Sequence, residues 1–309
     1  MPSFADRLCS AMLERDAPCV VGIDPVLDYI PDAFIQACDL RRDGELEERA
    51  RILEAYSLLT LEAVHDLVPA VKPQMAYFEL FGSYGMRALE RVIETARELG
   101  LLVLLDGKRG DIGSTSRAYA DAYLARTPAR PWEVDCMTLN PYLGDDSLQP
   151  FVDVALENDK GLFVCVRTSN PGADVTQLQE TRDGRLLYEV VADLVGEFND
   201  RVIGEHGFGS IGAVVGATQA EAASRLRERL PRTLFLVPGY GAQGGSLDTV
   251  RACFNAKRQG AIVNSARGVM YPHRFGGERA GPVADEGAIK DGIRAAARDF
   301  VGAIRSVLR

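Results

Sequence analysis

The chain has 309 residues, 47% of them hydrophobic, which is enough to bury a large core in one barrel-sized domain or in two smaller domains. The formal net charge of −9 argues against nucleic acid as a partner, because that binding depends on clustered Lys and Arg side chains. No uninterrupted apolar run approaches the length of about 18 residues that a membrane span needs, so we expect no membrane partner.

The cysteine and histidine residues do not form a metal-binding pattern. The six cysteines show no paired spacing, and several lie in apolar runs, which is typical of buried free thiols in a reducing, cytoplasmic compartment. His65, His206 and His273 are scattered singly, and an isolated histidine is more often a packed or exposed side chain than a ligand. We therefore predict no metal site.

The predicted elements begin with an amphipathic helix over residues 1–15. Ser3 caps this helix, and its mixture of acidic, basic and apolar residues is unlike a signal peptide. A short buried strand follows at 19–23. Residues 26–44 are predicted as an extended loop or short helix, and apolar residues at helical spacing predict a long helix over 45–67.

Strands and helices then alternate along the rest of the chain. Each strand is an apolar run that ends in polar residues, in several cases with glycines. The strands are predicted at 70–74, 101–105, 135–140, 161–166, 211–215, 234–237 and 261–264. The helices are predicted at 83–99, from 114 or 115 to 126, and at 147–157, 186–206, 219–230 and 285–308. Gly100 should end the first of these helices, and Ser114 or Thr115 should cap the second.

Short apolar strands that alternate with helices indicate a parallel α/β architecture. Eight units of this length favour a closed (β/α)₈ TIM barrel over an open doubly wound sheet. No linker or low-complexity stretch divides the chain, so we predict a single domain over residues 1–309, with an N-terminal helix and an extended loop or helix between the first two strands. In such a barrel the active site lies at the carboxyl ends of the strands.

Opposite charges follow the third strand. Asp106 and Lys108 are two residues apart and should therefore point the same way, while Asp111 adds a carboxylate that can reach the same ammonium from the loop. An isolated pair of this kind is commonly a salt bridge that seals the end of a sheet. It also matches the paired charges of catalytic sites, and a lysine between two aspartates stays protonated.

The ends of the last two strands resemble a phosphate-binding site. Glycines that let a backbone approach an anion closely stand at Gly239, Gly241, Gly244 and Gly245. Gln243 can donate through its amide, and Arg267, after the eighth strand, can bind two phosphate oxygens. The alternative is a plain glycine-rich turn with a solvated arginine. The coincidence of both features at the usual phosphate position of these barrels favours a phosphate site.

Six ordered strand-end motifs resemble the orotidine 5′-phosphate decarboxylase family, in the form of its second bacterial subgroup. The spacing of Asp106, Lys108, Asp111, Ile112 and Thr115, preceded by Asp24 and Lys72, carries this resemblance. It extends to the sequences at residues 72–74, 108–112, 168–172 and 238–245. A single Asp-x-Lys-x-x-Asp is weakly specific, whereas ordered matches from residue 20 to residue 268 are strong.

The resemblance implies decarboxylation of orotidine 5′-monophosphate to uridine 5′-monophosphate, the last step of de novo pyrimidine synthesis, without a metal or an organic cofactor. It implies that Lys108 protonates C6 of the pyrimidine and that Asp106 lies against the departing carboxylate. Lys72 and Asp24 would hold ribose hydroxyls. With Asp106, Lys108 and Asp111 they would complete a row of alternating charges, the charged row.

The resemblance also implies a homodimer with shared sites. Asp111, Ile112 and Thr115 would be contributed to the site of the neighbouring subunit. The pyrimidine ring would lie against Ser169 and near Pro238, and the 5′-phosphate would be held by Gln243 and Arg267.

Three rival functions share parts of these motifs. Sister sugar-phosphate lyases of the same barrel type carry an acid on the second strand that helps bind magnesium, but Lys72 stands in that place and a cation repels a metal. A Schiff-base aldolase would need Lys108 as an amine nucleophile, which flanking aspartates disfavour. A non-enzymatic phosphate-binding scaffold would have lost part of the charged row, and the row is complete.

Overall fold

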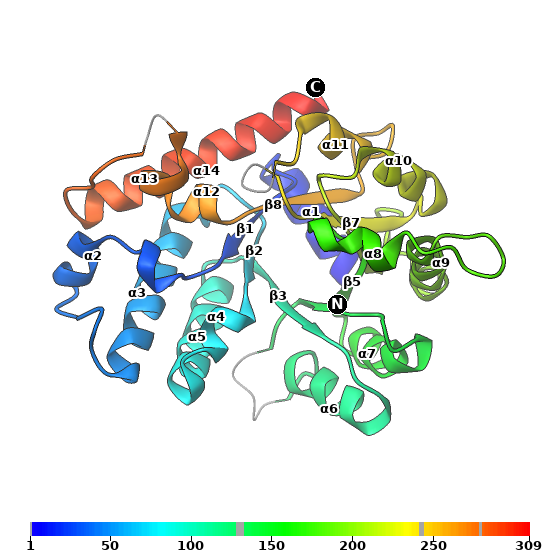
Figure 1. Ribbon diagram of the computed structural model, residues 1–309, viewed down its shortest axis with the longest axis horizontal. Coiled ribbons are helices and arrows are strands. Elements are labelled where there is room, and N and C mark those ends of the chain that lie inside the picture. The colour runs from blue at the N-terminus through cyan, green and yellow to red at the C-terminus, as the bar shows by residue number, and fades with distance from the viewer. Residues whose placement is uncertain (1, 128–132, 241–243, 278–279) are drawn as a thin grey trace.

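A computed structural model describes residues 2–127, 133–240, 244–277 and 280–309, whose strands form a closed barrel (Figure 1). Each strand pairs in parallel with its neighbours in sequence, and β8 pairs with β1. The strands are β1 Cys19–Ile23, β2 Ala70–Pro73, β3 Leu102–Arg109, β4 Cys136–Leu139, β5 Gly161–Arg167, β6 Gly209–Val215, β7 Thr233–Val237 and β8 Ala261–Ser265. This confirms the predicted (β/α)₈ barrel.

Helices surround the strands as an outer ring (Figure 1). The α-helices are α1 Phe4–Glu14, α2 Asp32–Ala37, α3 Leu46–Val64, α4 Met75–Glu79, α5 Gly82–Glu98, α6 Gly113–Tyr123, α7 Asp145–Glu157, α8 Asp174–Gln177, α9 Leu187–Asn199, α10 Ala220–Arg229, α11 Leu247–Ala252, α12 Arg267–Met270, α13 Pro272–Phe275 and α14 Glu286–Leu308. Short 3₁₀ helices are η1 Leu27–Tyr29 and η2 Pro171–Ala173. Among the described helices, none has the length and apolar content required to cross a membrane.

Helix α5 illustrates why the outer elements form where they do. Its buried residues Leu89, Val92 and Ile93 recur at helical spacing and face the strands. The helix ends at Glu98, and Gly100, just after the C-cap Leu99, has a left-handed φ of +74°. The amide of Gly100 donates to Arg97 O at 3.0 Å and that of Leu101 to Ala96 O at 2.9 Å, so the last turn is closed. The predicted stop at Gly100 is confirmed.

Helix α1 closes the amino-terminal end of the barrel. Ser3 caps it as predicted, because its hydroxyl accepts a hydrogen bond from Asp6 N. Phe4 packs edge-on against Phe163 of β5 with ring centroids 6.3 Å apart, and the helix joins the apolar cluster inside the strands. Since this end is filled by side chains, a ligand has access to the barrel only from the carboxyl ends of the strands.

Several predicted boundaries are wrong for identifiable reasons. Strand β3 continues through Asp106 and Lys108 to Arg109, where we expected a loop. Helix α6 begins at Gly113 with Ile112 at the cap position, so Ser114 and Thr115 lie within its first turn and do not cap it.

Two other predicted segments differ in detail. Helix α9 ends at Asn199, and the chain to His206 is not helical. The stretch 26–44 contains η1 and α2, and α2 packs against the C-terminal helix α14.

Candidate active site

A cavity of about 1270 Å³ opens at the carboxyl ends of the strands. It is lined by seven of the side chains that the sequence predicted for the site: Asp24, Lys72, Asp106, Lys108, Ser169, Pro238 and Arg267. They lie in or shortly after six different strands, β1, β2, β3, β5, β7 and β8, which the closed barrel brings to one end. The fold therefore brings together residues that are far apart in the sequence, from Asp24 to Arg267.

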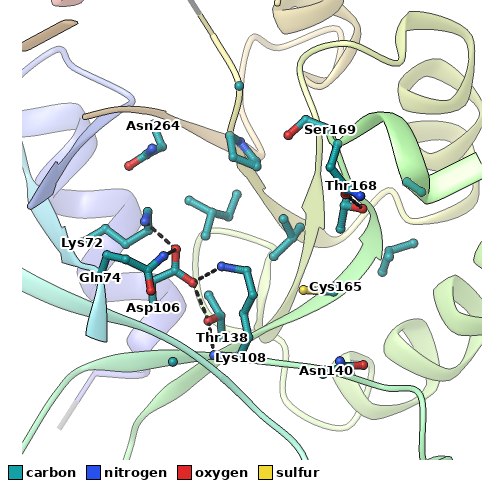
Figure 2. Close-up of a pocket in the computed structure, with 18 of the residues that line it drawn as sticks. Lys72, Gln74, Asp106, Lys108, Thr138, Asn140, Cys165, Thr168, Ser169 and Asn264 are labelled. Atoms are coloured by element: carbon teal, nitrogen blue, oxygen red, sulfur yellow. Dashed lines mark hydrogen bonds and ion pairs between the residues drawn. The ribbon is translucent and has the colours of Figure 1, made fainter. Parts of the chain in front are cut away.

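Asp106 is the centre of the polar network in this cavity (Figure 2). Its carboxylate lies 2.6 Å from Lys72 Nζ through Oδ2 and 2.6 Å from Lys108 Nζ through Oδ1. Thr138 Oγ1 donates to Oδ1 at 2.8 Å, and Gln74 Nε2 donates to Oδ2 at 3.1 Å. Both oxygens of the carboxylate thus accept two hydrogen bonds, which fixes its orientation before any ligand binds.

The charges in this network stabilise one another. Burial alone would raise the pKa of Asp106, but the charges of Lys72 and Lys108 and the hydrogen bonds they donate outweigh it, so that its pKa lies well below the usual range. Burial alone would lower the pKa of Lys72, but Asp106 and Asp24 more than compensate, and its pKa is raised. Both groups therefore remain charged at neutral pH.

The backbone of β3 is irregular where it presents Lys108. The register with β4 shifts between Leu105 and Arg109, and Lys108 has a left-handed φ of +42°. A lysine is rarely found in this conformation, which costs about 1 kcal/mol or more and is concentrated at functional sites. Its amide donates to Thr138 Oγ1 at 3.0 Å, so the hydroxyl that orients Asp106 also holds the backbone of Lys108. The half-exposed ammonium reaches into the cavity.

Asp24 follows β1 and faces the same cavity, and its buried Oδ1 atom has no polar partner among the described residues. Burial raises the pKa of its carboxyl, although the nearby Lys72 acts in the opposite direction. A buried carboxylate oxygen that is left without such a partner can accept a hydrogen bond from a ligand hydroxyl.

We expect the substitution Asp24→Asn to stabilise the folded protein at neutral pH. Because the pKa of Asp24 is raised on folding, the folded state disfavours its charged form. That cost is complete above the raised pKa and disappears as the pH falls below the unfolded value of about 3.9. Thermal unfolding should give the variant a higher Tm than the wild type at pH 7 and an equal Tm near pH 3. A lower Tm for the variant at pH 7 would contradict this assignment.

The glycine-rich loop after β7 is closed by its own backbone. The amide of Gly245 donates to Gly239 O at 3.0 Å, and Gly239 and Gly244 have left-handed φ values of +94° and +79°. A Cβ at Gly245 would lie 2.6 Å from Gly239 O, so only glycine fits there. Arg267 begins α12 at the end of β8 and lines the same cavity. The predicted residues Gly241 and Gln243 lie outside the described residues.

Ser169 stands at the end of β5, where a buried arginine organises the chain. Arg167 is 2% exposed and donates to Gln177 Oε1 at 3.1 Å and to Gln219 Oε1 at 2.9 Å. It also forms an ion pair with Asp174. These contacts tie the segment that carries Ser169 to α8 and to the chain before α10, at the rim of the cavity.

Three predicted site residues do not line the cavity of their own chain. Asp111 accepts a hydrogen bond from Ile112 N at 2.8 Å and, within the described part of the chain, forms no ion pair with Lys108. Ile112 is 58% exposed, and Thr115 is also exposed. The expectation that Asp111 reaches Lys108 from its own loop is therefore wrong for a single chain.

Two residues that hold Asp106, Gln74 and Thr138, were not predicted as site residues. Both could have been predicted from the alternation of side chains between the two faces of a strand. Gln74 lies two residues after Lys72 and shares its face, and Thr138 is a polar residue in the otherwise apolar strand β4.

Comparison with known proteins identifies the family. The model of the orotidine 5′-phosphate decarboxylase / HUMPS family matches residues 53–271. A protein of Rhodopirellula baltica named orotidine 5′-phosphate decarboxylase is 45% identical over 302 residues, which cover 96% of this chain and 97% of the relative. One of the same name from Caldicellulosiruptor saccharolyticus is 40% identical over 280 residues, covering 89% of this chain and 91% of the relative.

A solved structure agrees with these relatives. The OMP decarboxylase of Leishmania donovani superimposes with a TM-score of 0.72 at 32% identity, covering 99% of each chain. The resemblance drawn from the strand-end motifs is thereby confirmed. The chain belongs to the orotidine 5′-phosphate decarboxylase / HUMPS family.

Proposed function

We propose that this chain decarboxylates orotidine 5′-monophosphate to uridine 5′-monophosphate, without a metal or an organic cofactor. The observation that carries the proposal is the buried carboxylate of Asp106, held at 2.6 Å by the ammonium groups of both Lys72 and Lys108 in the cavity that Arg267 also lines. The relatives that bear the decarboxylase name favour this reaction over those of the sister lyases. Lys72 agrees with that choice, because its ammonium occupies the place of a metal-binding acid.

The chemistry requires a positive charge and a proton at one carbon atom. When the bond between C6 and the carboxylate breaks, the electron pair stays on C6 and carbon dioxide leaves. The ring offers no electron sink for this pair, so a cation must stabilise it and a donor must protonate C6. The ammonium of Lys108 can do both, while Asp106 lies against the departing carboxylate and holds the ammonium in place.

The fixed row of charges supplies part of the rate enhancement. Opposite charges about 4 Å apart attract by about 4 kcal/mol at an effective dielectric of about 20. Decarboxylations of this kind need roughly 20 kcal/mol of transition-state stabilisation, so the row has to act together with binding energy from the rest of the nucleotide. Because Lys72, Asp106 and Lys108 are oriented before substrate arrives, little reorganisation is required during the reaction.

The remaining predicted residues would bind the nucleotide away from C6. In this proposal Asp24 and Lys72 hold ribose hydroxyls, which agrees with the buried Oδ1 of Asp24 that no other described residue contacts by a hydrogen bond. Ser169 and Pro238 border the pyrimidine. Gln243 and Arg267 bind the 5′-phosphate at the closed glycine-rich loop.

We further propose that the chain acts as a cytoplasmic homodimer in which Asp111, Ile112 and Thr115 complete the site of the partner. Large exposed apolar side chains support an interface on this side of the barrel: Ile112 is 58%, Tyr142 80% and Leu143 51% exposed. The loops after β3 and β4 that carry them are neighbours, because the amide of Asn140 donates to Arg109 O at 2.9 Å.

Ultraviolet absorbance tests the proposed reaction. Purified protein mixed with orotidine 5′-monophosphate should cause the absorbance of the orotate ring to fall, with uridine 5′-monophosphate and carbon dioxide formed in equal amounts. A chelator should leave the rate unchanged. Absence of turnover would refute the proposed function, and loss of turnover in the chelator would favour the magnesium-dependent sister lyases.

A further inference from the structure

The turn that carries Asp24, residues 24–26, is hydrogen-bonded to the segment that follows β8. The hydroxyl of Tyr271 accepts a hydrogen bond from Val26 N at 2.8 Å and donates one to Asp24 O at 2.9 Å. The backbone N–H of Asp24 donates to Met270 Sδ at 3.1 Å. Pro25 has no N–H, so Tyr271 and Met270 together satisfy both N–H groups of the turn.

Tyr271 is itself fixed by its surroundings. It is 0% exposed, and its ring stacks on that of Tyr56 with centroids 5.4 Å apart and an interplanar angle of 7°. The ring of Tyr29 contacts it edge-on at 5.4 Å. The hydroxyl of Tyr56 donates to Met270 O at 2.6 Å. Because neighbouring rings pack against Tyr271 on more than one side, its hydroxyl has a defined position relative to the turn.

The same segment carries Arg267 at its other end. Arg267 is the first residue of α12, and its carbonyl accepts a hydrogen bond from the amide of Tyr271 at 3.0 Å. Figure 1 shows α12 beside β1 at the end of β8. The side chain of Arg267 lines the cavity, while Tyr271 supports the turn after β1. The positions of Asp24 and Arg267, which both line the cavity, therefore depend on the same short segment, residues 267–271.

The position of the Asp24 carboxylate depends on the backbone of this turn, because few interactions of the carboxylate itself fix it. Its Oδ1 atom is buried and has no hydrogen-bond partner in the part of the chain that the structure describes. A desolvated carboxylate of this kind gains by moving toward water or toward Lys72, and a fixed backbone limits how far it can move.

From these contacts we propose that Tyr271 is a positioning residue, whose hydroxyl holds the Asp24–Val26 turn so that the Asp24 carboxylate points into the cavity. This inference rests on the proposed function, in which Asp24 binds a ribose hydroxyl. Removal of the hydroxyl leaves the fold and the aromatic packing in place but frees the turn.

The test is a set of variants assayed for kcat/KM with orotidine 5′-monophosphate. Tyr271→Phe should lower kcat/KM by about tenfold to a hundredfold, because a small displacement of a binding group has effects of this size. Tyr56→Phe is the matched control: it also loses one buried hydroxyl that bonds to the same segment, but this hydroxyl does not touch the Asp24 turn. It should stay within about twofold of the wild type. Met270→Leu preserves volume, removes the acceptor of Asp24 N and should cause a smaller loss than Tyr271→Phe.

Coupling to Asp24 separates positioning from a general loss of structure. In an Asp24→Asn background, Tyr271→Phe should have almost no further effect, since the group that it positions is already altered. Equal losses in Tyr271→Phe and Tyr56→Phe, or full additivity with Asp24→Asn, would overturn the inference. Should Tyr271→Phe not fold, Met270→Leu in the same two backgrounds decides the question. Absence of turnover in the wild type would refute the proposed function, and the inference with it.

Discussion

Replacing Lys108 with alanine is expected to lower kcat for orotidine 5′-monophosphate by at least about 10⁴-fold, because the change removes the group proposed to be both the proton donor and the cation nearest to the developing charge. The fold should be unaffected. Lys108 is about half exposed, so its ion pair with Asp106 contributes little to stability, and Lys72, Gln74 and Thr138 still hold that carboxylate. Steady-state kinetics and a thermal melt of the same preparation measure both effects.

Two companion variants separate the possible causes of this loss. Lys108→Arg keeps the positive charge but gives up its proton far less readily, and it should be almost as inactive as the alanine variant. Lys108→Gly relieves the left-handed backbone at this position and should be at least as stable as Lys108→Ala while remaining inactive. Turnover by Lys108→Ala within tenfold of the wild type would rule out Lys108 as the proton donor.

Mixed dimers of two inactive variants are expected to regain activity. If Asp111 serves the neighbouring site, a dimer of one Asp106→Ala chain and one Asp111→Ala chain has one site with both changes and one site with neither. Such heterodimers, purified through two different affinity tags, should show about half the activity of the wild-type dimer, whereas each homodimer should be inactive.

A second heterodimer provides the control for this complementation. Asp106 and Lys108 bond to each other within one chain, so a dimer of Asp106→Ala and Lys108→Ala chains has no intact site and should remain inactive. Activity in this control, or no recovery in verified Asp106→Ala and Asp111→Ala heterodimers, would show that the sites are not shared in the proposed way.

The barrel and most of its site residues could be predicted because their signals are local. Apolar strand runs, helical spacing and polar strand ends locate Asp24, Lys72, Asp106, Lys108, Ser169 and Arg267 at one end of a parallel barrel. Short helices such as α8 and α12 escaped prediction because four residues are too few to show a helical period.

Other features depend on contacts between distant parts of the chain. The continuation of β3 past Gly107 depends on pairing with β4, and it overrides the turn signal of the glycines. The role of Tyr271 behind Asp24 depends on residues about 250 positions apart in sequence meeting in the closed barrel. In the proposed dimer Asp111 serves the site of a second copy, which local signals in one chain do not describe.

Whether Lys72, Asp106 and Lys108 are arranged for a negative charge at C6 is tested most directly by a ratio of two dissociation constants. One ligand is uridine 5′-monophosphate, and the other is its 6-hydroxy derivative, which carries an anionic oxygen at C6 at neutral pH. Calorimetry should show the wild type binding the anion at least about 10³-fold more tightly, and Lys108→Ala should lose most of this preference. Equal affinities in the wild type, or an unchanged ratio in the variant, would contradict the proposed role of the charged row.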